Sequence, residues 1–191
     1  GLEFPISVRA EVEPAWAGDT ARRRETFPRW QVIEYRFPGT QMTSTNPLKI
    51  TWSDGGKYPP DELRALFGGA EWPDQGMLVI GEDGVMFKPY PAAPRLFAGG
   101  KRKKVRPPQL EAENHYHSYI DAIVKDEPSL LRSAFPYAAR ATEMVLLGTI
   151  AVRFPGQDLA WDGPGMRFPE VAAANQFVGR DYRQGWEVKG L

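Results

Sequence analysis

Alternating apolar and polar residues mark the first half of the chain. This period of two places apolar side chains on one face of an extended segment, so it predicts half-buried β-strands. The alternation is clearest at residues 6–12, 30–37 and 48–52. Two shorter apolar runs, at residues 77–80 and 85–87, flank the sequence Gly81-Glu82-Asp83-Gly84, which predicts a hairpin. Short or irregular connections join these strands, which favours an antiparallel or mixed sheet.

Helical patterns dominate the second half. Residues 61–67 follow two prolines and predict a short helix, while residues 137–152 are apolar nearly all round and predict a buried helix. The stretch 110–124 predicts a helix with one apolar face, formed by Tyr116, Tyr119, Ile120, Ile123 and Val124. A strand-like segment at 159–161 and a short helix near 169–177 complete the pattern.

Strands followed by helices are typical of the α+β class. We expect an open, mostly antiparallel sheet with helices packed on one face. One domain spans residues 1–191, and residues 155–191 form a wrapping C-terminal tail. The other face of the sheet, which we expect to be rich in Val, Ile and aromatic residues, then needs a cover. A homo-oligomer formed through this open face is the simplest cover.

Composition excludes several classes of function. The chain has 24 basic and 24 acidic residues, so neither nucleic acid nor an anionic membrane is expected as a partner. No stretch approaches the length of a membrane span. The absence of cysteine removes disulfides, zinc–thiolate sites and a cysteine nucleophile. No Gly-x-Gly-x-x-Gly or Walker-type loop is present, so no nucleotide site is expected in this sequence. Gly1 in place of Met leads us to expect an excised piece of a longer protein.

A group of chemically suitable residues closes the third predicted strand, in Thr51-Trp52-Ser53-Asp54-Gly55-Gly56-Lys57. The ring of Trp52 can stack on a sugar, while Asp54 and Lys57 can hydrogen-bond to hydroxyl groups. A packed tryptophan with a capping aspartate explains the same residues. Both interpretations stay open at this point.

Two histidines, His115 and His117, are the only ones in the chain. The surrounding period is helical and points their side chains far apart, so a shared metal ion is not expected. His117 and Asp121 are four residues apart, so a solvated or structural pair on one helix face explains this region. The functional interpretation is that His115 borders a substrate pocket at the start of the helix. Glu143 lies in an apolar helix, where a structural ion pair with Arg140 explains it better than a catalytic role.

The order of several short segments resembles the C-terminal region of Gfo/Idh/MocA oxidoreductases, in particular their bacterial branch. The matching segments are Pro-Ile-Ser-Val-Arg-Ala at 5–10, Glu-Thr-Phe-Pro at 25–28, Pro-Leu-Lys-Ile-Thr-Trp at 47–52, Asp-Gly-Gly at 54–56, Pro-Pro-Asp-Glu-Leu at 59–63, His115 with Ile-Asp-Ala at 120–122, residues 142–148, Trp161-Asp162, Met166-Arg167-Phe168, Ala-Asn-Gln at 174–176 and Tyr-Arg-Gln-Gly-Trp at 182–186. Each segment is weak alone, and their order along nearly the whole chain carries the resemblance.

The resemblance implies a parent protein with an N-terminal Rossmann domain that binds NAD or NADP. The catalytic lysine of the family lies in that domain, and its Asp-x-x-x-His pair precedes the strand matched by residues 6–12. Neither motif is in this sequence, so the chain alone is expected to bind no cofactor and to transfer no hydride. The resemblance implies a bacterial source and leaves the cytoplasm and the periplasm open.

The sequence therefore predicts the substrate-side and assembly domain of an NAD(P)-dependent oxidoreductase that acts on a sugar-like molecule. The expected substrate contacts are Trp52, Asp54, Lys57, His115, Trp161 and Arg167. The alternative is a non-catalytic carbohydrate-binding or oligomerisation module. A stand-alone carbohydrate hydrolase or lyase needs two carboxylates across a cleft, and no spacing in the sequence selects such a pair.

Overall fold

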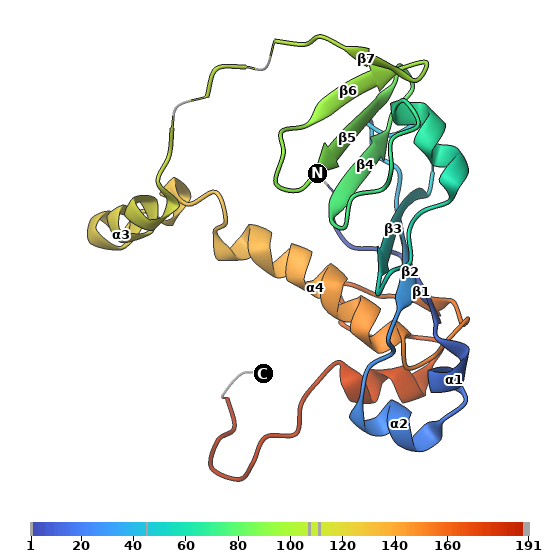
Figure 1. Cartoon of the computed structure of the whole chain (residues 1–191). Helices are drawn as coiled ribbons and strands as arrows, with labels where there is room; N and C mark the ends of the chain where they lie inside the picture. The colour runs from blue at the N-terminus through green and yellow to red at the C-terminus, as the bar shows by residue number, and fades with distance from the viewer. Residues whose placement is uncertain (1, 45, 107, 111, 189–191) are drawn as a thin grey trace. The chain divides into compact units, whose positions relative to one another are not determined.

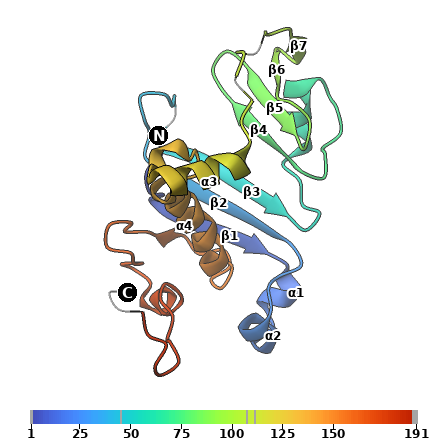
Figure 2. The ribbon, with the colours of Figure 1, turned by 90° about the vertical axis from the view of Figure 1, so that its left-hand side faces the viewer.

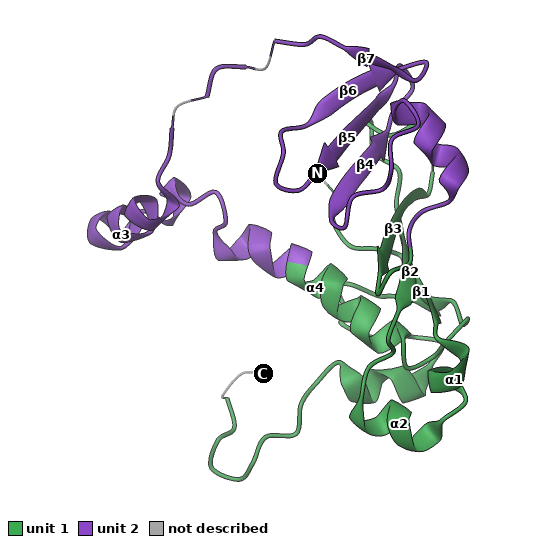
Figure 3. Cartoon of the chain, viewed as in Figure 1, with its two compact units in different colours: residues 1–57, 142–191 green, residues 58–141 purple. Residues whose placement is uncertain are grey.

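The chain divides into two compact units, each built on its own sheet. The computed structural model describes residues 2–44, 46–106, 108–110 and 112–188. The first unit comprises residues 1–57 and 142–191, and the second comprises residues 58–141 (Figures 1 and 3). Both sheets are four-stranded and antiparallel. The α+β class and the antiparallel pairing are thus confirmed, with the strands shared between two sheets where the sequence suggested one.

The first sheet has the strand order β3-β2-β1-β8. It contains β1 (Ser7–Val12), β2 (Gln31–Phe37), β3 (Leu48–Asp54) and the short β8 (Leu159–Ala160). All four strands lie where the hydrophobic pattern predicted them, to within two residues. The inner face buries alternate residues, because Val8 pairs with Tyr35 and Ala10 pairs with Ile33 in the β1–β2 register.

The helix α4 (Phe135–Ala151) covers the inner face of the first sheet (Figure 2). Leu147, Ile150 and Ala151 share one core with the strands. A Cβ atom at Gly148 would lie 2.2 Å from the hydroxyl oxygen of Tyr35, so only glycine lets the helix approach the sheet this closely. The prediction of a helix buried along its whole length was wrong. Its buried residues all lie at positions 147–151, and the first turns contribute to neither core cluster.

The remaining elements of the first unit extend the same core. Two short helices that the sequence did not predict, α1 (Pro14–Ala17) and α2 (Thr20–Glu25), connect β1 to β2. Trp16 is fully buried there, and its indole N–H donates to the hydroxyl oxygen of Thr26 at 3.0 Å. The segment expected as a tail belongs to this unit, where it forms β8 and a 3-10 helix (Ala172–Phe177) and adds Phe168 to the core.

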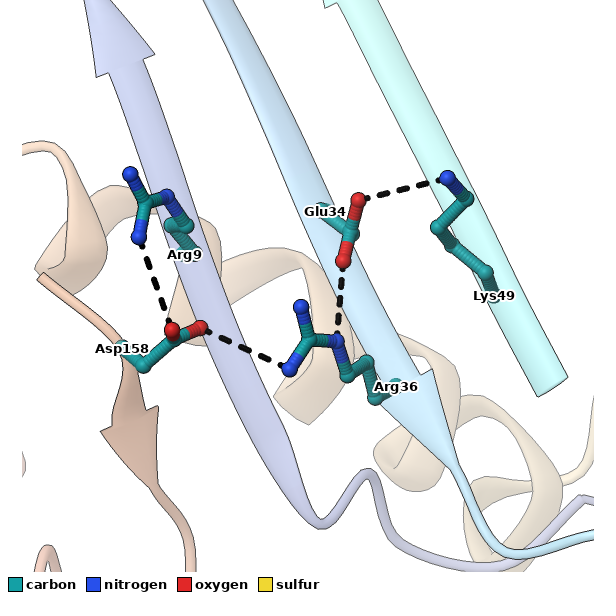
Figure 4. Close-up of polar contacts among 5 residues, drawn as sticks. All are labelled: Arg9, Glu34, Arg36, Lys49 and Asp158. Atoms are coloured by element: carbon teal, nitrogen blue, oxygen red, sulfur yellow. Dashed lines mark hydrogen bonds and ion pairs between the residues drawn. The ribbon is translucent and has the colours of Figure 1, made fainter. Parts of the chain in front are cut away.

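The outer face of the first sheet is charged, so the expectation of an apolar open face was wrong. The register places Arg9, Glu34 and Arg36 on this side, and their charges form a continuous network across the strands (Figure 4). Arg36 donates to Glu34 at 2.9 Å, and Lys49 lies 3.5 Å from the other oxygen of Glu34. Asp158 lies 3.5 Å from Arg9 and 3.9 Å from Arg36. Five charges on this face are therefore paired within the chain, whereas the exposed Glu11 on the same face forms no ion pair among the described residues.

The second sheet has the strand order β4-β5-β6-β7. It contains β4 (Gly76–Ile80), β5 (Val85–Pro89), β6 (Arg95–Ala98) and β7 (Lys101–Lys103). The β4–β5 hairpin is confirmed, and β6 and β7 were not predicted. The inner face packs on a 3-10 helix (Asp61–Phe67), where the rings of Phe67 and Phe87 stack at 4.1 Å. Phe97 completes this small core.

The helix α3 (His115–Lys125) also belongs to the second unit and is followed by a 3-10 turn (Pro128–Leu130). It begins at His115 because the side chain of Asn114 caps it, accepting hydrogen bonds from the backbone N–H groups of Tyr116 and His117. The predicted start at residue 110 was therefore too early. The predicted apolar face exists but is exposed, and the one buried residue of the helix is Ala122.

Candidate functional site

The carboxylate of Asp54 organises a polar group at the end of β3. The register places Asp54 opposite Gln31. One carboxylate oxygen accepts a hydrogen bond from the backbone N–H of Gln31 at 3.2 Å, and the other accepts from the Gln31 side chain at 2.9 Å. The indole N–H of Trp52 donates to the second oxygen at 3.1 Å. Asp54 therefore fixes the orientation of the Trp52 ring, which is still 52% exposed.

A tight turn brings Lys57 beside the same group. The backbone N–H of Lys57 donates to the carbonyl oxygen of Asp54 at 3.2 Å. Between them, Gly55 adopts a φ of +65°, and a Cβ atom there would lie 2.1 Å from the carbonyl oxygen of Arg29. Both the positive φ and the lack of space for a Cβ atom require glycine at position 55. The turn places the ammonium group of Lys57 4.3 Å from the centre of the Trp30 ring, within cation–π range.

Three of the expected contact residues thus lie together at one corner of the first sheet, namely Trp52, Asp54 and Lys57. Two members of this group, Gln31 and Trp30, were not predicted from the sequence. The irregular connection between β2 and β3 leaves their pairing register open, so the residue opposite Asp54 could not be identified from the sequence. We name Trp30, Gln31, Trp52, Asp54 and Lys57 the Trp52 group.

Tyr35 lies on the inner face of the same sheet, and the charge of Asp54 affects its pKa. Burial, followed by the negative charge of Asp54, raises the pKa of Tyr35 to about 12. Its phenol therefore stays protonated throughout the physiological range. Since its side chain is only 2% exposed, Tyr35 acts as a core residue beside the Trp52 group and is not available to a ligand.

Trp161 is placed differently from Trp52. It is only 7% exposed, and its ring packs against Phe168 at a centroid distance of 4.8 Å. Its indole N–H donates to the carboxylate of Glu143 on α4 at 2.7 Å. Both the face and the polar edge of this ring have partners within the chain. Glu143 is therefore bonded to a tryptophan, and this bond joins the C-terminal segment to α4.

Arg167 is exposed and paired with Asp162 by a 3.0 Å hydrogen bond from its Nε. This bond, with a second one from the backbone N–H of Gly165, lowers the pKa of the Asp162 carboxyl. Asp162 and Trp161 border a shallow hollow of about 220 Å³. Trp161 lies at the start of β1, because its backbone N–H donates to the carbonyl oxygen of Ile6. Asp54 lies at the other end, because it pairs with Gln31, which pairs with Val12. Ile6 and Val12 are six residues apart along the strand, a distance of about 20 Å.

His115 belongs to the second unit, where it borders a hollow of about 610 Å³. The hollow is lined by two tyrosines, two leucines and polar side chains: Leu110, Glu113, His115, Tyr116, Ser118, Tyr119, Leu131, Arg132 and Ser133. Glu113 accepts a hydrogen bond from the Ser118 hydroxyl at 2.9 Å and pairs with Arg132 at 2.5 Å. These bonds hold the segment after α3 against the start of the helix.

The expected contact residues therefore fall into three places. Trp52, Asp54 and Lys57 form one group, Trp161 and Arg167 lie at the far end of β1, and His115 lies in the other unit. Among the described residues, no cluster of three or more His, Asp or Glu side chains is suited to hold a metal ion. No described helix is long and apolar enough to cross a bilayer.

No relative of this chain was found among known protein families or curated proteins. No protein-family model matches the chain. No curated protein matches it at a significant level. The fold is α+β, and the family to which the ordered sequence segments point stays a prediction.

Proposed function

We propose that this chain is the substrate-side and assembly domain of an NAD(P)-dependent oxidoreductase that acts on a sugar-like molecule. One observation supports the substrate side most directly: the half-exposed Trp52 ring is held by Asp54 next to Lys57. The ordered sequence segments that resemble Gfo/Idh/MocA oxidoreductases support the redox context. The same segments motivate a separate Rossmann domain as the holder of the cofactor.

The Trp52 group has the chemistry that a sugar needs. An indole face packs against the apolar C–H side of a sugar ring, and a fixed ring loses little conformational freedom when it does so. A carboxylate offers about four acceptor positions, and Asp54 uses three of them within the chain. The remaining position can accept a hydrogen bond from a sugar hydroxyl, and the ammonium of Lys57 can donate to another.

This proposal divides the work between two domains. The nicotinamide, bound elsewhere in the parent protein, would accept or supply the hydride. Residues of the present chain would bind the ring and hold one hydroxyl in a fixed orientation. Because orientation contributes to the rate without any proton transfer, this role needs no catalytic residue in this chain.

Sugar binding is tested by following the tryptophan indole N–H signals of the isotopically labelled chain by NMR during titration with glucose and with myo-inositol. We expect the Trp52 signal to shift, with a weak dissociation constant of about 1–10 mM for so few contacts. Trp52→Ala removes the binding. The matched control is Trp186→Ala, which removes another exposed tryptophan of the first unit. A Trp52 signal that does not move at about 100 mM of either compound contradicts the proposed site.

The redox context is tested separately. We expect NADH titrated into this chain to bind with no measurable affinity, and we expect the gene segment encoding the residues before Leu2 to specify a strand followed by Gly-x-Gly-x-x-Gly. Micromolar affinity of the present chain for NADH would overturn the division of work between two domains. A sugar-binding chain with no such upstream sequence would favour the carbohydrate-binding module instead.

A further inference from the structure

The outer face of the second sheet is uncovered. Its side chains are apolar except for three lysines, namely Lys88, which pairs with Met77, and Lys101 and Lys103 on the edge strand β7. The side chains of Met77, Val79, Met86 and Leu96 lie on this face, since Val79 pairs with Met86 and Met86 pairs with Leu96 across the strands. Met77 is 48% exposed, Val79 45% and Leu96 38%. Neighbouring residues in each strand point inward to the Phe67 core. Methionine and aliphatic side chains gathered on one rigid surface are typical of a binding face.

The two edges of this sheet carry opposite charges. Glu82 and Asp83 form the tip of the hairpin that includes the edge strand β4, and Lys101 and Lys103 lie on the opposite edge strand, β7. All four side chains are exposed. Among the described residues, none of these four forms an ion pair. These charges contrast with the paired network on the outer face of the first sheet.

The acidic tip and the basic edge lie at the same end of the second sheet. Lys101 pairs with Ala98 at the turn between β6 and β7. The hairpin tip reaches this end as well, because a Cβ atom at Gly84 would lie 2.2 Å from the carbonyl oxygen of Phe97. At this end of the sheet, the β4 edge is therefore negatively charged and the β7 edge is positively charged.

This arrangement is self-complementary. Consider two copies of the sheet stacked face to face about a two-fold axis that runs parallel to the strands. The axis places the β4 edge of each copy over the β7 edge of the other and keeps the same ends together. Glu82 and Asp83 then face Lys101 of the second copy, and Met86 faces Leu96. Sheets that pack in this way lie about 10 Å apart with their strands rotated by about 30°.

We propose that the second sheet is an assembly surface, which packs through its outer face against the same face of a second copy of this chain. The inference rests on the assembly half of the proposed function and is independent of sugar binding. The face measures on the order of 300 Å² from the strand spacing and rise. This is small for a stable dimer, so the association is weak and requires high protein concentration.

Sedimentation velocity over a range of protein concentrations, from about 10 to about 300 μM, tests the proposal. The wild-type chain is expected to shift reversibly from monomer to dimer. Two charge-reversal variants, Lys101→Glu/Lys103→Glu and Glu82→Lys/Asp83→Lys, are expected to stay monomeric, because each then carries like charges on both edges. An equimolar mixture of the two variants restores the dimer, since one copy now has two acidic edges and the other has two basic edges.

The control variant Arg24→Glu/Arg180→Glu makes the same change in net charge as the Lys101→Glu/Lys103→Glu variant, but on exposed residues of the first unit. It is expected to dimerise as the wild type does, and circular dichroism confirms that every variant is folded. Dimers that survive both reversals, or a mixture that stays monomeric, would overturn this surface while leaving assembly through another face intact. A wild-type chain that is monomeric throughout would overturn both this surface and the assembly role.

Discussion

The outer faces of the two sheets differ in the kind of side chain that they expose. Each sheet is open and antiparallel with one face on its own core, and each therefore has a second face to expose. The first sheet covers that face with charges that satisfy one another, from Lys49 through Glu34 and Arg36 to Asp158 and Arg9 (Figure 4). The second sheet exposes methionine, valine and leucine there. Its charges on that face lie at the two edges and at Lys88 on the inner strand β5.

This difference shows that openness alone does not identify an assembly surface. A face whose charges are paired within the chain gains little from a partner, because the partner must replace interactions that already exist. A face of exposed apolar side chains gains by removing them from water, at roughly 25 cal/mol for each Å². The second sheet is therefore the better candidate for assembly, although its face is small.

The largest expected effect concerns the core of the second sheet. Phe67 is 2% exposed and contacts both Phe87 and Trp72, so Phe67→Ala is expected to cost about 3–4 kcal/mol in the free energy of unfolding of that unit. Hydrogen exchange followed by mass spectrometry checks this. The amides of β4 and β5 are expected to lose protection while those of β1 and β2 keep it. An equal loss in both sheets would show that the two cores unfold as one.

A second effect distinguishes the core of the first sheet by its pH dependence. The pKa of Tyr35 is raised from 10.0 to about 12, so the folded state retains a proton that the unfolded state loses. The stability that this phenol contributes is complete below pH 10 and is lost as the pH rises toward 12, by roughly 2–3 kcal/mol. Urea unfolding at pH 8, 10 and 11.5 measures the loss.

The variant Tyr35→Phe has no phenol to ionise and is expected to lose less stability over this range than the wild type. Tyr182→Phe serves as the control, because Tyr182 is 41% exposed in the same unit. An equal alkaline loss of stability in Tyr35→Phe and Tyr182→Phe would show that burial of Tyr35 does not cause the pH dependence.

The smallest effect concerns the charged outer face of the first sheet. Asp158→Asn leaves Arg9 and Arg36 without the carboxylate between them. Since these side chains are 40–49% exposed, water screens their charges, and the expected loss is below about 1 kcal/mol. The loss is also expected to shrink in 1 M salt. A loss of several kcal/mol in urea unfolding would mean that the network contributes far more than a solvated surface pair.

Much of the first sheet could be predicted from the sequence, because strict alternation at residues 6–12 and 30–37 specifies both strand and buried face. The polarity of its outer face was readable from the same alternation, through Arg9, Glu34 and Arg36. The expectation of apolar residues there came from the general need of an open sheet for a cover. The strands β6 and β7 were missed because Arg95–Ala98 and Lys101–Lys103 are short and carry no alternating pattern of useful length.

The Trp52 group could be predicted in part. Residue types and closeness in sequence selected Trp52, Asp54 and Lys57, but the bonds from Gln31 depend on a strand register that a long connection does not fix. His115, Trp161 and Arg167 were selected one at a time. Sequence alone carries no information on whether such separate residues meet, and the fold places Trp161 about 20 Å of strand away from Asp54.

The contrast between the two outer faces is tested most directly by methyl NMR at increasing protein concentration. Val32 provides a methyl probe on the outer face of the first sheet, and Met86 and Leu96 provide probes on that of the second. We predict that the signals of Met86 and Leu96 shift with concentration while those of Val32 stay constant. Signals of Val32 that shift while those of Met86 and Leu96 do not would contradict the account.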